Sequence, residues 1–253
     1  DRIYRLKNGK APLSYMIKGS DIYYFDEELG FETELKYPLT SIDTDDFRTS
    51  SLDQFDVLIL PETYYWEALD EDSIKTLKSW IQKGGKLIAM GSSVGLFNDK
   101  EGFGISINNE VEKEKTEDDL DSKLQPYDQR EINNVKNFIT GSVYKITIDN
   151  SHPMAFGYNN IYYSLKQGKE SYKFLDSGYN VGYIKGDAVS VSGFSGKEAK
   201  KGLKNSIVFA EKRMGRGSVI YLVDDVLFRS FWENGKLFLV NSIFFVNNNK
   251  III

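Results

Sequence analysis

Residues 91–95, Gly-Ser-Ser-Val-Gly, have the spacing of a nucleophile elbow. They follow the apolar stretch 86–90, which is predicted to be a buried strand. A strand that runs into such a glycine-flanked turn presents the central residue beside backbone N–H groups, and here that residue is Ser93. A serine hydroxyl has a high pKa, so it needs a general base within hydrogen-bond reach.

Three other residues are candidate partners for a nucleophile. His152 is the only histidine, and it lies before a proline in a turn-like stretch, where a histidine more often caps or bonds locally. Asp224 and Asp225 follow an apolar strand, at the edge where open α/β sheets bind ligands. Paired carboxylates could act as acid and base or bind calcium. Alternatively, one caps the next turn and the other pairs with Arg229 or Arg216.

An aromatic triplet, Tyr64, Tyr65 and Trp66, follows the apolar stretch 55–61 and is a candidate ligand-binding surface. Aromatic side chains at the end of a strand could form a sugar-binding or protein-binding platform. Packing in the core or at its rim is the competing interpretation.

Composition excludes several classes of site and partner. With no cysteine and one histidine, the chain cannot build a thiolate zinc site, a disulfide or a zinc site with two or three histidines. The net charge of −5 comes without a basic stripe, so nucleic acid is not an expected partner. No apolar run approaches the roughly 20 residues of a membrane span.

The order of elements predicts one α/β domain over residues 1–253. Buried strands at 55–61 and 86–90 enclose a helix at 71–83, which Asp70 caps and two glycines end. This alternation predicts a three-layer sandwich with a mainly parallel, flavodoxin-like sheet. Residues 98–123 are expected to be a mobile acidic insertion, and 127–139 a helix ended by Gly141.

Residues 141–194 are predicted to be a β-rich extension of the same domain, because short apolar runs alternate there with glycines. A hairpin over 206–223 and a buried closing helix over 236–246 complete the expected fold. The chain begins at Asp1 without an initiator methionine or a signal peptide, so we expect it to be part of a longer protein.

Several segments in order together resemble a known family: the class I glutamine amidotransferase-like domain appended to secreted bacterial zinc carboxypeptidases. The segments are Leu77 to Gly95, Asn150 to Tyr158, Gly178 to Gly182, Met214 to Ile220 and Asp224 to Trp232. The resemblance implies a secreted or periplasmic protein, and an N-terminal peptidase domain of the same polypeptide as the partner. That domain would bind catalytic zinc through two histidines and a glutamate. The resemblance also implies a protein or cell-wall ligand.

This sequence departs from the amidotransferase pattern at the two positions that carry chemistry. The family has a cysteine nucleophile where Ser93 stands, and a histidine base after the last strands, where residues 223–226 read Val-Asp-Asp-Val. The resemblance therefore predicts a noncatalytic accessory domain without a cofactor of its own. The alternative is a cryptic serine hydrolase that uses Ser93, assisted by His152 or by Asp224 and Asp225.

Overall fold

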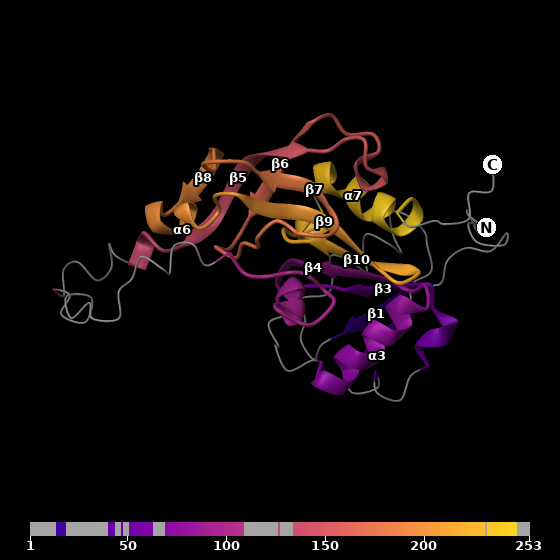
Figure 1. Cartoon of the computed structure of the whole chain (residues 1–253). Helices are drawn as coiled ribbons and strands as arrows, with labels where there is room; N and C mark the ends of the chain where they lie inside the picture. The colour runs from indigo at the N-terminus through magenta and orange to yellow at the C-terminus, as the bar shows by residue number, and fades with distance from the viewer. Residues whose placement is uncertain are drawn as a thin grey trace.

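The computed structural model describes residues 14–18, 40–43, 47, 51–62, 69–108, 126, 134–230 and 232–246. Within these residues ten strands form one sheet in the order β2-β1-β3-β4-β10-β9-β7-β5-β6, and β8 pairs with β5 (Figure 1). The strands are β1 Ser14–Lys18, β2 Thr40–Asp43, β3 Val57–Leu60, β4 Lys86–Met90, β5 Ile139–Ile148, β6 Ile161–Lys166, β7 Tyr179–Ile184, β8 Ser190–Ser195, β9 Ser206–Met214 and β10 Gly217–Leu222. The helices are α3 Glu71–Gln82, α6 Lys197–Lys201 and α7 Glu233–Phe244, with 3-10 turns η3 Leu52–Gln54, η4 Gly91–Phe97, η6 Pro153–Ala155 and η7 Phe228–Ser230.

The sheet is mixed, which confirms the α/β class and corrects the expectation of a mainly parallel sheet. Strands β2, β1, β3, β4 and β10 pair in parallel. All described pairings among β10, β9, β7, β5, β6 and β8 are antiparallel. The reason lies in the connections, since a two-residue turn joins β9 to β10, whereas a parallel pair needs a crossover of a dozen residues or more.

Helix α3 forms where the sequence predicts a helix, and its cap is the predicted one. The Asp70 side chain accepts a 2.9 Å hydrogen bond from the Ser73 N–H, and two acidic residues occupy the first turn. The C-terminal end needs a glycine at position 85, because an added β-carbon there would lie 2.4 Å from the ring of Trp80. This close approach lets the helix turn directly into β4.

Two hydrophobic clusters lie on opposite faces of the sheet. Along β3, Leu58 and Leu60 belong to the cluster that includes α3, whereas Val57 and Ile59 belong to the cluster that includes α7. Figure 1 shows α3 and α7 on the two sides of the central strands. A strand buried on both faces reads as a continuous apolar run, as the sequence predicted for residues 55–61.

Gly141 has a different role from the predicted one. It does not end a helix: it lies inside β5, which begins at Ile139, and it has a φ of +148°. The pairing of β5 with β8 shifts by a residue between Ile139 and Gly141, as in a β-bulge. On β8, Gly193 pairs with Ser142 and is constrained by close approach, since a β-carbon there would lie 2.2 Å from the Gly141 carbonyl oxygen. The positive φ at the bulge explains the glycine at 141, and close backbone approach explains the glycine at 193.

The first part of the predicted acidic insertion packs against the sheet. Phe103 and Ile105 are fully buried in the cluster around α3, and Ile107 forms an isolated bridge with Tyr172. The remainder, 109–123, and the helix expected before residue 134 lie outside the described residues. Among the helices that the structure does describe, none is long and apolar enough to cross a membrane.

Candidate functional site

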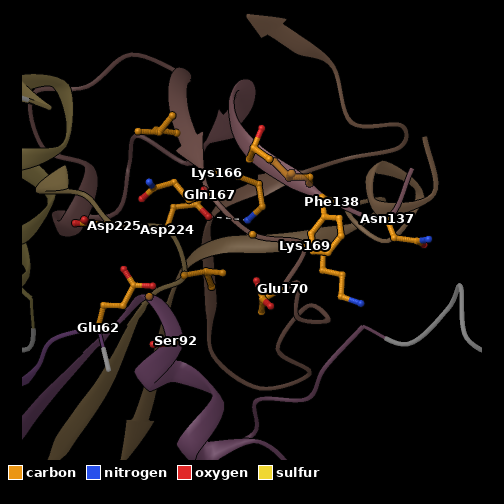
Figure 2. A pocket seen from close by; sticks show the side chains of 16 residues that line it. Glu62, Ser92, Asn137, Phe138, Lys166, Gln167, Lys169, Glu170, Asp224 and Asp225 are labelled. Carbon is orange, nitrogen blue, oxygen red and sulfur yellow. Dashed lines mark hydrogen bonds and ion pairs between the residues drawn. The ribbon is translucent and has the colours of Figure 1, made fainter. Parts of the chain in front are cut away.

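A cavity of about 550 Å³ opens at the carboxyl ends of β3, β4 and β10. This is the edge at which open α/β sheets place their ligands. Glu62, Gly91 and Asp225 line the cavity from these strand ends, and Lys166 and Glu170 line it from β6 and the loop that follows (Figure 2). The cavity thus joins the parallel and antiparallel halves of the sheet.

The residue at the elbow of the β4–η4 turn is Gly91. It is the first residue after β4, it has a φ of +54°, and it lines the cavity. A β-carbon added there would lie 3.0 Å from Cδ of Glu62 and 3.1 Å from its Cβ and Cγ. The Glu62 side chain therefore covers the elbow, at the place where a nucleophilic side chain would emerge.

Ser93, the candidate nucleophile of the alternative hydrolase hypothesis, does not line this cavity. Its side chain is 1% exposed, and its hydroxyl donates a hydrogen bond to the Pro61 carbonyl oxygen. No described histidine or carboxylate accepts from this hydroxyl. Ser92, the preceding residue, lines the cavity instead.

His152 has two hydrogen bonds, both structural. Its Nδ1 accepts from the Met154 N–H at 3.2 Å and caps η6, and its Nε2 lies 2.9 Å from Oε2 of Glu211. Because Nδ1 accepts, the proton of the neutral ring is on Nε2 and is donated to Glu211. His152 and Glu211 are both buried, and neither lines the cavity.

Asp224 and Asp225 have separate roles. Asp224 forms a 2.6 Å ion pair with Lys166, and its other oxygen accepts from the Ser164 hydroxyl. Asp225 accepts a 2.8 Å hydrogen bond from the Leu227 N–H, which caps the following turn. Asp224 thus pairs with a cation, and Asp225 caps a turn. The cation that pairs with Asp224 is Lys166, on the distant strand β6, whereas the sequence suggested an arginine.

Glu62 lines the cavity and has a strongly raised pKa. Its pKa is raised from 4.5 to about 7, first by burial and then by the nearby carboxylates of Asp225, Glu170 and Asp224, in that order of effect. Sequence reasoning missed this residue, although the signal was present, since Glu62 follows the buried strand β3 just as Asp224 follows β10. Lys166 carried no such signal, because only the fold of the second half brings β6 to this edge.

The predicted aromatic surface and possible metal sites complete the list of sequence candidates. Tyr64, Tyr65 and Trp66 lie outside the described residues. Within the described part of the chain, no group of three or more histidine or acidic side chains could hold a metal ion. The carboxylates at the cavity are therefore too dispersed to act as a set of metal ligands.

Comparisons with known proteins identify the fold. No family model and no curated protein matches the sequence. A glutamine amidotransferase from Thermotoga maritima is similar in structure, with a TM-score of 0.53 and 9% identity over 94% of this chain and 98% of that one. A GMP synthase component from Thermoplasma acidophilum has a TM-score of 0.52 and 13% identity, with 92% of each chain covered.

The chain has a glutamine amidotransferase-like fold. The same fold also occurs within a much larger chain: a β-galactosidase from Bacillus circulans sp. alkalophilus matches 92% of this chain with a TM-score of 0.52 and 11% identity. This chain covers 30% of that enzyme. At such identities the likeness concerns the fold, which is found both as a separate protein and as one part of a larger enzyme.

Proposed function

We propose that this chain is a noncatalytic accessory domain that retains the cavity of an amidotransferase-like fold without its nucleophile. One observation carries the proposal: the elbow residue that faces the cavity is Gly91, and Glu62 covers the position of its missing side chain. Covalent catalysis needs a nucleophile held beside a base at this point. A site built in this way can bind a ligand but has no nucleophile at the elbow position.

The positions of the two hydrolase candidates support the same conclusion. The Ser93 hydroxyl donates to a backbone carbonyl, and the His152 ring is engaged by Glu211 and by the Met154 N–H. Neither side chain lines the cavity. No observation favours a cryptic serine hydrolase over the accessory role.

The accessory role in a larger protein has two supports. The fold forms under a third of the similar β-galactosidase chain, so it occurs as one part of a large enzyme. The sequence segments described above resemble the amidotransferase-like domain of secreted zinc carboxypeptidases. We therefore propose a secreted or periplasmic carboxypeptidase as the parent, with zinc held by its peptidase domain and with that domain as the main partner.

The noncatalytic claim is tested by hydrolysis of glutamine and of p-nitrophenyl esters. The chain, its Ser93→Ala variant and its Ser92→Ala variant should all give the uncatalysed rate. A measurable rate that Ser93→Ala abolishes and Ser92→Ala retains would establish the serine hydrolase instead.

The proposed parent is tested separately, by the coding sequence upstream of Asp1. A His-x-x-Glu pair followed by a distant histidine is expected there, because these residues would hold the zinc of the peptidase domain. An upstream sequence without them would overturn the carboxypeptidase assignment and leave the noncatalytic claim unaffected.

A further inference from the structure

The cavity differs in character between its two ends. Figure 2 shows Glu62, Asp224 and Asp225 at one end, and Phe138 with Asn137 at the other. The Phe138 side chain is 58% exposed although it lines a cavity, so a ligand would gain apolar contact area there. Concave sites with an apolar wall and a few convergent polar groups are typical of small-molecule binding.

The charge lining this cavity is predominantly negative. Four carboxyl groups line it against two lysines. Of these lysines, Lys166 is held in an ion pair with Asp224, and both side chains are about 95% buried. This pair forms a fixed, locally neutral part of the wall. Outside this pair, the acidic side chains Glu62 and Glu170 line the cavity with the single lysine Lys169.

Two alternative ligand classes fit this lining poorly. An anionic ligand would be repelled by the same carboxylates that act on Glu62. A bare metal ion would need three or more converging ligands, and the described residues offer no such group. A larger organic cation can reach dispersed carboxylates, because its charge is carried on a body that fills the cavity.

We propose that this cavity binds an organic ammonium compound, with the ammonium group at Glu62 and an apolar body against Phe138. The inference rests on the proposed function, since it assigns a ligand class to the cavity that the noncatalytic domain retains. A single ammonium group is a strong hydrogen-bond donor that suits carboxyl acceptors. The cavity volume of about 550 Å³ accommodates a compound with one aromatic ring.

Binding of a cation at this site is coupled to the ionisation of Glu62. The charged groups that face it are Asp224 and Asp225 after β10, Glu170 and Lys169 in the loop after β6, and Lys166 on β6. With a pKa of about 7, the Glu62 carboxyl is mostly protonated at pH 6 and mostly ionised at pH 8. An ammonium ligand favours the ionised form, so it should bind about tenfold more weakly at pH 6 than at pH 8.

Three probes of one shape and different charge test the proposal: phenethylamine, 2-phenylethanol and 3-phenylpropionate. The whole chain is titrated with each probe at pH 6 and pH 8, and binding is followed by NMR chemical-shift changes. Phenethylamine remains protonated at both pH values, as a primary amine with a pKa near that of lysine. Only this probe should bind, with shifts at Gly91, Ser92 and Phe138 and the tenfold pH effect.

Three variants test which side chains cause the phenethylamine affinity and its pH dependence. Glu62→Gln should weaken phenethylamine binding at pH 8 about tenfold and remove its pH dependence. Phe138→Ala, at an exposed side chain, should weaken binding at both pH values and leave their ratio unchanged. Glu101→Gln removes an exposed carboxylate outside the cavity and should behave like the parent.

The proposal is overturned if 2-phenylethanol or 3-phenylpropionate binds as tightly as the amine, if no probe produces saturable shifts at the cavity, or if Glu62→Gln keeps the parent's pH dependence. Each of these outcomes concerns the ligand class alone. The noncatalytic assignment is decided by the hydrolysis assays, so the two failures are distinguishable.

Discussion

The Glu62 carboxyl group and Gly91 are in direct apposition, and a β-carbon on Gly91 would lie 3.0 Å from Cδ of Glu62. The two residues follow adjacent parallel strands, β3 and β4, at their carboxyl ends. Glycine at the elbow permits the left-handed φ of +54° and also makes room for the glutamate. Each residue is therefore suited to the presence of the other, and the Glu62 side chain covers the elbow.

Replacing Gly91 with alanine should destabilise the protein for two reasons that can be separated. A non-glycine residue with this φ costs about 1–2 kcal/mol, and the new methyl group also crowds Glu62. Gly186→Ala is the matched control, because Gly186 has a φ of +73° with nothing within 4 Å of an added β-carbon. Urea unfolding should show a larger loss for Gly91→Ala, and Glu62→Ala in the same chain should remove the excess. Equal losses at both glycines would show that Glu62 does not crowd the elbow.

The stability of the protein should fall as the pH rises through neutrality. The pKa of Glu62 is raised from 4.5 to about 7, so the folded state binds this proton more tightly than the unfolded state. The resulting stabilisation is complete below about pH 4.5 and is lost as the pH rises through about 7. For a partly buried group we expect a fall of about 1–3 kcal/mol between pH 5 and pH 8.

The Glu62→Gln variant isolates this contribution from other titrating groups. The free energy of unfolding is measured in urea for parent and variant at pH 5, 6, 7 and 8. The difference between the two free energies of unfolding should change most between pH 5 and pH 7 and change little between pH 7 and pH 8. A constant difference would mean that Glu62 titrates in the same way in the folded and unfolded states.

The environments of Ser92 and Ser93 can be compared by introducing one cysteine at a time, because the chain has none. Ser92 lines the cavity, whereas Ser93 is 1% exposed and bonded to the Pro61 carbonyl. Ser92→Cys should therefore react with iodoacetamide at least about tenfold faster than Ser93→Cys, since alkylation requires an accessible thiolate. Faster labelling at position 93 would place that residue at the cavity and revive it as a nucleophile.

His152→Ala should be among the most destabilising single changes in the chain. It removes the cap of η6 and leaves Glu211, which is 2% exposed, without its ring partner. Leaving a buried carboxylate without its hydrogen-bond partner costs about 1–3 kcal/mol or more. Asp187→Ala is the comparison, because it breaks an exposed 3.5 Å pair with Lys204 and should cost less than about 1 kcal/mol. Thermal unfolding that ranks the two variants alike would contradict a structural role for the histidine.

Sequence patterns predicted elements whose causes are local. The sequence predicted helix α3 because its signals are all local. They are the Asp70 cap, the acidic first turn and one apolar stripe, which together span about a dozen residues. The sequence also predicted strands β3 and β4, because a strand buried on both faces appears as a continuous apolar run. The prediction that Gly141 ends a helix was wrong, since a glycine that ends a helix and one that forms a bulge are alike in sequence. Only the pairing of β5 with β8, whose register shifts between Ile139 and Gly141, distinguishes them.

The candidate site was predictable in part. The sequence directed attention to the end of β4 and to Asp224 and Asp225, because these positions follow buried strands. It did not indicate which residue of the turn faces the cavity, and it favoured Ser93 where the structure places Gly91 and Ser92. A shift of one or two residues in a tight turn reverses the direction of a side chain, and spacing alone does not fix it.

The sequence by itself determined the class of fold, the lack of cysteine chemistry and the polar character of the strand ends, since these follow from composition and from local periodicity. Only the tertiary structure decided that Glu62 covers Gly91, that Lys166 neutralises Asp224, and that Glu211 holds His152 away from the cavity. Each of these pairs joins strands or turns distant in the chain. Their energies depend on burial and separation, and these exist only once the sheet has formed.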